Sequence, residues 1–298
     1  MTPSSPRERA TSALSTLGLP TSDVVFESTR RFPDGTRFRV EIPSVEGPAA
    51  FEAALQAADA LGVRFDRISQ GSGIMLLTDD EITQMVALGG AHKVDVCLFV
   101  GPRAAWDVGA QAVAAAGRVV AGSLRGADQL RSGLSDVFRA VDLGLRSVLV
   151  ADVGLLSVVG RLRETGDLPR DLTMKVSVSL PVANPATARL FEELGADTLN
   201  LPVDLSVAQI AAIRQVTTIP LDVYVESPDD FGGFIRYHEL PDIVRAASPV
   251  YIKFAVRNAA SLYPSGEHLA PMVIATAKER VRRSAIGLAL LEREGITS

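Results

Sequence analysis

The strongest constraint on the fold is an alternation of strand-like and helix-like segments that continues along most of the chain. We expect strands at 36–42, 65–70, 94–100, 119–123, 147–152, 173–180, 198–202, 221–226 and 250–257. Repeated strand–helix units form a parallel sheet, and about nine candidate strands come nearest to the eight of a closed barrel. The alternation therefore predicts an α/β fold, a (β/α)8 barrel of the TIM type.

One of these candidate strands is then extra or peripheral. We expect it to be 119–123, which is short and flanked by glycine, with the strand that begins at Val250 as the alternative. The expected helices are 48–61, 79–88, 103–116, 128–145, 155–165, 185–194, 206–216, 239–246 and a long final helix at about 271–294.

The sequence before the barrel predicts a separate extension. Residues 24–31 and 36–42 flank Phe32-Pro33-Asp34-Gly35, and a Pro-Asp-Gly turn between two β-rich runs is typical of a hairpin. We expect residues 1–35 to form an N-terminal extension, a helix with a hairpin arm. Residues 36–298 are expected to form a single barrel domain, because no change of composition marks a second one.

Composition limits the partners and the cellular setting. The formal net charge is −5, and the 30 basic and 35 acidic side chains are spread along the sequence, which gives no sign of nucleic-acid binding. No long apolar run stands near the start, so we expect neither a secretory signal nor a membrane anchor. Cys97 is the only cysteine, which excludes an internal disulfide and cysteine-ligated iron–sulfur clusters and favours a reducing, cytoplasmic setting.

Three of the expected strands carry polar residues on one face, although a strand buried on both sides is normally apolar. Alternate residues of a strand lie on the same side of the sheet. The polar sets are Lys175, Ser177 and Ser179; Asp222, Tyr224 and Glu226; and Tyr251, Lys253 and Arg257. Because barrel interiors are packed with apolar side chains, these faces predict either a functional site or a network of buried ion pairs.

Glu226, Lys175 and Lys253 are the candidate catalytic residues. Glu226 ends its strand and precedes a loop with two glycines, a position that suits a general acid or base. A lysine inside a barrel can form an imine with a carbonyl when its pKa is lowered, or stabilise a negative charge as a cation. The alternative is a lysine–carboxylate pair that only fills the interior, with Glu41 and Asp222 among the candidate partners.

Candidate substrate-binding residues lie at expected strand ends, where barrels of this type have their active sites. Gln70 and Ser72 belong to a Gly/Ser loop whose backbone amides suit a phosphate or carboxylate, and a plain flexible turn explains this loop equally well. Arg103 and Arg125 follow expected strands, where each is either an anion-binding residue or a surface arginine. The full set is Gln70, Ser72, Arg103, Arg125, Asn200 and Arg257.

A metal site is an open alternative. Glu226 with Asp152 or Asp229 offers the carboxylate oxygens that Mg²⁺ or Mn²⁺ prefers. Asp152 also stands where it would cap the helix expected from 155, and this interpretation is favoured. The three histidines show no spacing typical of zinc, and the sequence has no P-loop, nucleophile elbow or dinucleotide-binding fingerprint.

The C-terminal third resembles the collagenase-like peptidase family, whose members are barrels of this type. The resemblance covers 221–226 with the loop that follows, 237–244, 250–257 and a final helix after Tyr263. In that family a strand with a lysine and, four residues later, an arginine follows a short helix, and Lys253 and Arg257 match this pattern. Family members often carry several cysteines, some of which hold iron–sulfur clusters, whereas this chain has one; Glu226 stands where the family usually has histidine. The resemblance implies the barrel fold, and a peptidase as an alternative function.

The leading hypothesis is an enzyme that acts on a small anionic or carbonyl-bearing metabolite by acid/base chemistry, of the lyase, aldolase or isomerase type. A metal-dependent hydrolase or peptidase is the first alternative, and a non-catalytic subunit or binding module is the second. The expected partner is a small-molecule substrate, and a homo-oligomer is left open. The site assignments share one geometric requirement, namely that Glu41, Lys175, Asn200, Glu226 and Lys253 converge.

Overall fold

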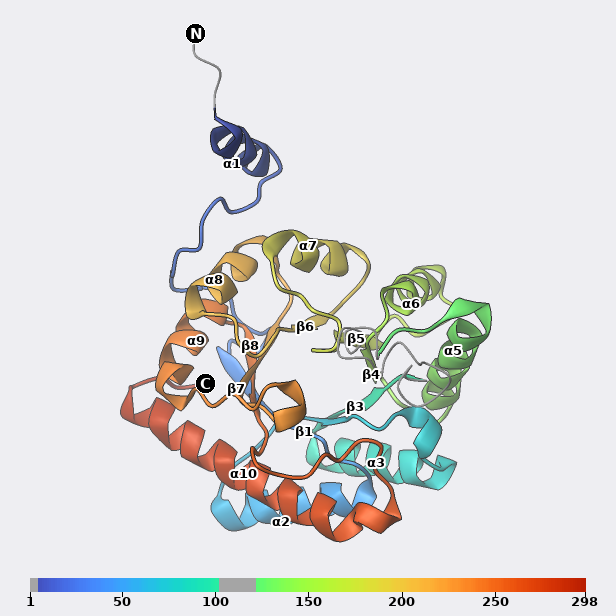
Figure 1. Cartoon of the computed structure of the whole chain (residues 1–298). Helices are drawn as coiled ribbons and strands as arrows, with labels where there is room; N and C mark the ends of the chain where they lie inside the picture. The colour runs from blue at the N-terminus through green and yellow to red at the C-terminus, as the bar shows by residue number, and fades with distance from the viewer. Residues whose placement is uncertain (1–4, 102–121) are drawn as a thin grey trace.

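Eight parallel strands close into a barrel in the computed structural model, which describes residues 5–101 and 122–298 (Figure 1). Each strand pairs with its neighbours in chain order, and the last strand returns to the first. This confirms the (β/α)8 barrel. The strands are β1 (Phe38–Pro43), β2 (Arg67–Gln70), β3 (Asp95–Phe99), β4 (Ser147–Val150), β5 (Thr173–Val176), β6 (Thr198–Asn200), β7 (Leu221–Glu226) and β8 (Val250–Phe254).

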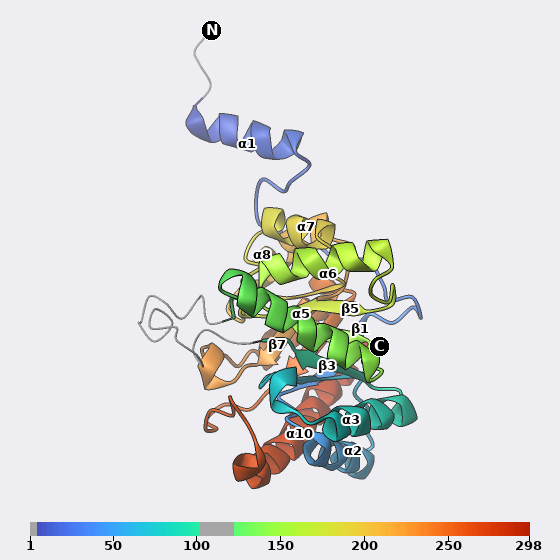
Figure 2. The same ribbon diagram turned by 90° about the vertical axis from the view of Figure 1, so that its right-hand side faces the viewer.

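Helices surround the barrel, and the long last helix runs along the first helix of the barrel (Figures 1 and 2). No described helix has the length and apolar character needed to cross a membrane. The helices are α1 (Pro6–Thr16), α2 (Pro48–Leu61), α3 (Asp79–His92), α5 (Gly126–Asp142), α6 (Val153–Thr165), α7 (Pro185–Glu193), α8 (Val207–Val216), α9 (Leu240–Ala247) and α10 (Ala270–Arg293). Short 3-10 turns are η1 (Ile74–Leu76), η3 (Asp229–Phe231), η4 (Tyr237–Glu239) and η5 (Glu267–Leu269).

Side-chain caps fix where several of these helices begin. Thr78 and Ser206 form capping boxes at the starts of α3 and α8. Asn184 caps α7 ahead of a proline in its first turn, and Asp152 accepts a hydrogen bond from the backbone of Leu155 in α6. The loops that precede these capped helices follow the carboxyl ends of the strands.

The strand that begins at Val250 is β8 and belongs to the barrel, since it pairs with both β7 and β1. It is therefore not an added strand. The expected helix 103–116 and most of the other candidate strand, 119–123, lie outside the described residues.

The expected hairpin arm is wrong, because residues 24–31 contain no strand. The turn itself is present, with the backbone N–H of Gly35 bonded to the carbonyl of Phe32. The physical reason is that β1 already pairs with β2 on one edge and β8 on the other, so no free edge remains for a hairpin partner. Figure 1 shows α1, which precedes this segment in the chain, standing away from the barrel.

The barrel has an apolar layer outside its strands and a divided interior. Outward side chains such as Ile42, Ile68 and Val148 pack beneath the helices. Inside, a small separate apolar cluster is formed by Cys97 and Phe99 on β3 with Leu149 and Ala151 at β4. The remaining strands contribute the polar and charged interior that forms the candidate site.

Candidate functional site

Glu41 lies at the centre of a buried cluster of charges inside the barrel. Its Oε1 accepts hydrogen bonds from Ser69 Oγ at 2.7 Å and lies 3.1 Å from Lys253 Nζ. Its Oε2 accepts from Arg67 Nε at 2.7 Å and from Lys175 Nζ. Side chains from β1, β2, β5 and β8 therefore meet at one fully buried carboxylate.

Asp222 on β7 is the second carboxylate of the cluster. Its Oδ1 lies 2.5 Å from Arg67 Nη2, and its Oδ2 lies 3.3 Å from Lys175 Nζ and accepts from Thr198 Oγ1 at 3.0 Å. Three cations, those of Arg67, Lys175 and Lys253, thus pair with two carboxylates. Nearby Asp95 has no ion pair with them among the described residues.

The pKa values follow from this arrangement. Burial alone would raise the pKa of Glu41, but Arg67 and the two lysines outweigh it and hold that pKa well below its usual range. For Lys175, burial and the neighbouring Arg67 lower the pKa despite the carboxylates. Burial raises the pKa of Asp95, which favours its neutral form. The ion pairs of the cluster therefore join three basic side chains, those of Arg67, Lys175 and Lys253, to two carboxylates.

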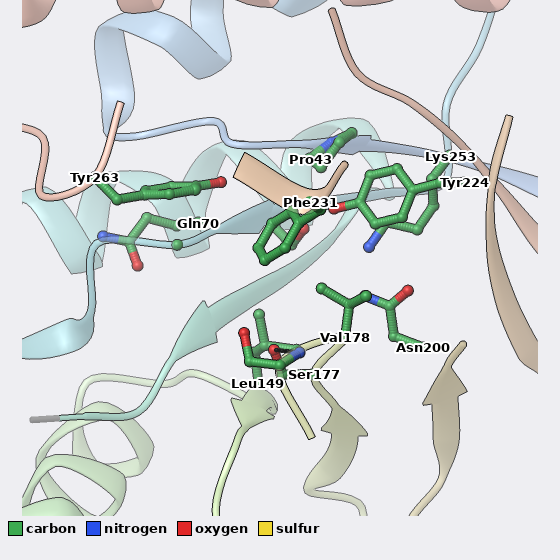
Figure 3. Close-up of a pocket in the computed structure, with 13 residues that line it drawn as sticks. Pro43, Gln70, Leu149, Ser177, Val178, Asn200, Tyr224, Phe231, Lys253 and Tyr263 are labelled. Carbon is green, nitrogen blue, oxygen red and sulfur yellow. Dashed lines mark hydrogen bonds between the residues drawn. The ribbon is translucent and has the colours of Figure 1, made fainter. Parts of the chain in front are cut away.

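A small pocket of about 30 Å³ lies above the cluster, at the carboxyl ends of the strands (Figure 3). Its wall combines three aromatic rings with polar groups from several strands. The residues used below are Ser177, Asn200, Tyr224, Phe231, Lys253 and Tyr263. Since the active sites of (β/α)8 barrels form at this end, the pocket is the candidate active site.

Lys253 connects the cluster to the pocket. Its Nζ pairs with Glu41 and lies 4.2 Å from the ring centre of Tyr224, while the side chain lines the pocket. Lys175 differs, because it is fully buried and does not line the pocket. Of the two candidate lysines, only Lys253 is therefore positioned to touch a ligand.

Asn200, at the end of β6, also lines the pocket and is 2% exposed. Its Oδ1 has no hydrogen-bond partner among the described residues. Figure 3 shows its amide near the amino group of Lys253, with the amide oxygen turned away from the pocket. The structure thus brings together Glu41, Lys175, Lys253 and Asn200, as the geometric requirement predicted for four of its five residues.

Glu226 lies apart from this group, so the expected convergence is wrong for this residue. The pairing of β7 with β8 shifts register between Tyr224 and Glu226, which takes Glu226 out of the inward alternation. Its Oε1 accepts from the backbone N–H of Arg257 at 3.0 Å, and its Oε2 accepts from Tyr237 and lies 3.4 Å from Arg283 on α10. It does not line the pocket, and its catalytic role stays a prediction.

The Gly/Ser loop after β2 binds a carboxylate of the protein itself. The backbone amides of Gly71 and Ser72 donate to Glu46 at 2.7 and 3.0 Å, so they are not open to a substrate anion. Gln70 lines the barrel pocket and also, together with Ser72, a second pocket beside the starts of α2 and α10.

The predicted arginines do not gather at the pocket. Arg257 is exposed and pairs with Asp229 at 3.1 Å. Arg125 is exposed at the start of α5 and does not line the pocket. Arg103 lies outside the described residues.

The candidate metal ligands do not fit a shared metal ion. Asp152 caps α6 and also accepts from the backbone of Leu124 at 3.0 Å, Asp229 pairs with Arg257, and Glu226 is bound as described above. Across residues 5–101 and 122–298, no three His, Cys, Asp or Glu side chains are arranged to hold a metal ion. Use of Mg²⁺ or Mn²⁺ stays a prediction.

Sequence reasoning missed Arg67, Phe231 and Tyr263. Arg67 had a readable signal, because Arg67 and Ser69 alternate with the apolar Ile68 in an expected strand. The two aromatic residues come from loops, one after β7 and one after β8. No periodicity marks such positions, so only the folded loops show that the rings line the pocket.

Comparison with known proteins bears on the expected family resemblance. Residues 119–227 match the sequence profile of peptidase family U32. The resemblance to collagenase-like peptidases is thereby confirmed, although the match covers β4 to β7 and overlaps the segments first compared only at 221–227. The chain matches no curated protein sequence.

Several solved structures are similar to this chain at low sequence identity. A U32 peptidase is 20% identical with a TM-score of 0.38, over 70% of this chain and 74% of that one. A putative lyase/mutase from Burkholderia cenocepacia is 14% identical with a TM-score of 0.46, over 90% and 85%. A Rubisco-like protein from Rhodopseudomonas palustris is 16% identical with a TM-score of 0.48, over 84% and 64%. Identities this low transfer no activity.

Proposed function

We propose that the protein is an enzyme that binds a small anionic or carbonyl-bearing metabolite in the barrel pocket and acts on it by acid/base chemistry, as lyases, aldolases and isomerases do. The observation that carries the proposal is the position of Lys253. Its side chain lines the pocket, and the cluster below it pairs three cations with two carboxylates. Buried charge without a counter-charge is costly, so this site favours a negatively charged ligand group.

Lys253 is the residue that would contact the reacting group. An ammonium held against a carbonyl or carboxylate oxygen stabilises the negative charge that develops when a proton or a carbon substituent leaves the neighbouring carbon. Glu41, at 3.1 Å, fixes where this ammonium lies. Glu41 and Lys175 are positioning residues in this proposal, since neither lines the pocket.

The carboxylate beside Lys253 is poorly suited to assist imine formation. Imine formation needs a neutral amine, and therefore a group that accepts the proton of the lysine. The pKa of Glu41 is held well below its usual range, so its carboxylate is a poor proton acceptor. Electrostatic stabilisation is thus the preferred use of Lys253, and borohydride trapping with mass spectrometry would detect the imine route.

Proton transfer can be tested without knowing the natural substrate. A panel of small 2-oxo and hydroxy acids is incubated with the protein in deuterium oxide, and exchange at the carbon next to the carbonyl or carboxylate is followed by NMR. We expect exchange with the native protein, and at least about a hundredfold slower exchange with Lys253→Met. Undiminished exchange in Lys253→Met would rule out the proposed role of Lys253.

A metal-dependent hydrolase or peptidase is the second candidate, and the family match over residues 119–227 is the observation that favours it. Asn200 and Tyr224 belong to the matched segment and line the pocket. Peptide hydrolysis that is lost on chelation and restored by Mn²⁺ or Mg²⁺ would support this candidate over the first. A pocket that binds ligands without converting any of them would support a non-catalytic binding module.

A further inference from the structure

An open groove of about 430 Å³ borders the barrel pocket at the carboxyl ends of the strands. Its walls come from the loops that follow β5, β6 and β7. The apolar side chains that line it are Val178, Pro181, Pro202, Val203, Phe231 and Phe234. Val178 and Phe231 line the barrel pocket as well, together with Lys253 (Figure 3). The groove and the barrel pocket therefore share a wall.

The barrel pocket alone gives room only for the reacting end of a molecule. Its volume of about 30 Å³ is that of a water-sized group, whereas sites for small molecules usually have about 300 Å³ or more. Most of a substrate must then lie outside it. The second pocket, beside the starts of α2 and α10, shares Gln70 with the barrel pocket, but the amide of Gln70 is bonded to the backbone of Gly73 at 3.0 and 3.3 Å and fills that side. The groove is therefore the better placed of the two spaces.

A buried arginine fixes two walls of the groove relative to each other. Arg236 is 1% exposed, and its Nη1 donates to the backbone carbonyls of Val203 at 3.1 Å and Leu205 at 2.7 Å. Its guanidinium carbon lies 5.4 Å from the ring centre of Phe234, within the range of a cation–π contact. One side chain thus joins the loop after β6 to the loop after β7. A groove held in this way by the protein's own contacts binds a ligand without the cost of ordering its walls.

The lining of the groove determines which end of a ligand it suits. Phe234 is 39% exposed, and ligand atoms that cover its ring remove apolar surface from water, which is favourable. Among the described residues that line the groove, Asp204 carries the only charge, and it is exposed. A carboxylate there disfavours an anionic group in the groove. The acid end of a ligand is therefore favoured near Lys253, and an apolar end near Phe234.

We propose that the substrate carries an apolar substituent, which binds in the groove while the anionic or carbonyl oxygen of the same molecule binds Lys253. This inference rests on the proposed function, because it names the substrate class of that same site. Phe231 and Phe234 are then specificity-determining residues. They favour acids with a branched aliphatic or aromatic substituent over short-chain acids.

Three probes separate the two ends of this site. They are 3-phenylpropanoate, propanoate, which lacks the ring, and 3-phenylpropanol, which lacks the carboxylate. Their affinities for the full-length native protein are measured by ligand-observed NMR titration. We expect 3-phenylpropanoate to bind at least about tenfold more tightly than propanoate, because its ring leaves water for the groove. Equal binding of the two acids overturns the inference and leaves the anion pocket in place. Binding of the alcohol as tightly as 3-phenylpropanoate overturns the proposed function, because Lys253 then recognises no acid.

Phe234→Ala assigns the preference to the groove. We expect this variant to bind 3-phenylpropanoate at least about fivefold more weakly than the native protein and propanoate within about twofold of it. Ile235→Ala is the matched control, since Ile235 is the next residue, is 48% exposed and does not line the groove. We expect it to bind both acids as the native protein does.

Val203→Ala gives a second test at the opposite wall, because it shortens a lining side chain and keeps the backbone carbonyl that binds Arg236. We expect it to weaken 3-phenylpropanoate more than propanoate. A native preference for 3-phenylpropanoate retained in both Phe234→Ala and Val203→Ala, or an equal loss in Ile235→Ala, overturns the inference. Absence of binding by both acids to the native protein overturns the proposed function as well.

Discussion

The amino group of Lys253 lies 3.1 Å from Glu41 Oε1, in a position where the lysine side chain lines the pocket and the carboxylate does not. This pair joins a buried network of charges to the surface that a ligand would touch. Removal of Glu41 should therefore have a different consequence from removal of Lys253. Loss of the carboxylate should affect stability first, whereas loss of the lysine should affect binding first.

Glu41→Gln is expected to destabilise the fold by about 3–5 kcal/mol, because it leaves three buried cations opposite one carboxylate. Lys175→Met is the matched control at the same depth. It leaves two cations opposite two carboxylates and is expected to cost clearly less. Urea unfolding of the two variants measures the difference, and an equal loss for both would show that charge balance does not control stability here.

Acid should weaken the fold in a defined direction. The pKa of Glu41 is lowered in the folded protein, so its contribution to stability is present above its usual value of 4.5 and is lost as pH falls toward the lower folded value. The free energy of unfolding of the native protein should therefore decrease as pH falls below about 4.5. In Glu41→Gln this decrease should be smaller. Identical pH dependence of the two proteins between pH 3 and 5 would contradict the assignment.

A rise in pH should increase the contribution of Lys175 to the free energy of unfolding. Its pKa is lowered from 10.5 by burial and by Arg67, so the unfolded chain binds its proton more tightly than the folded protein does. Stability from this residue should rise as pH increases from the folded pKa of Lys175 toward 10.5. Comparing native protein with Lys175→Met by thermal unfolding between pH 7 and 10 isolates this contribution, which should be absent from the variant.

Gly71→Ala is expected to disturb the pocket from outside it. A Cβ at this position would lie 2.6 Å from Cζ of Tyr263, so the ring must move. We expect a loss of about 1–3 kcal/mol in stability and weaker ligand binding, because Tyr263 lines the pocket. Gly90→Ala is the control, since a Cβ there meets nothing within 4 Å. Unchanged ligand affinity in Gly71→Ala would show that the position of Tyr263 is unimportant for binding.

Chelation is expected to leave ligand binding unchanged. The carboxylates that could have shared a metal ion are engaged elsewhere, Asp152 with the start of α6 and Asp229 with Arg257. Titrations of one small acid before and after exhaustive treatment with EDTA provide the comparison. An affinity lost after EDTA and regained with Mg²⁺ or Mn²⁺ would favour the hydrolase hypothesis.

The sequence was sufficient to predict the barrel and the buried polar strand faces, because both depend on short-range periodicity. Lys175, Asp222 and Lys253 alternate with apolar neighbours in three separate strands, and a closed parallel barrel brings such faces together. The prediction failed for Glu226 because a register shift of one residue reverses the side of the strand on which a residue lies. It failed for the Gly/Ser loop because Glu46, which occupies the loop amides, is 25 residues away in the sequence.

A crystal structure of the protein soaked with glycolate tests the central claim most directly. The account predicts electron density for the acid in the barrel pocket, with its carboxylate against Lys253. Density for glycolate only at other sites, with water alone beside Lys253 at concentrations that saturate binding in solution, would contradict it.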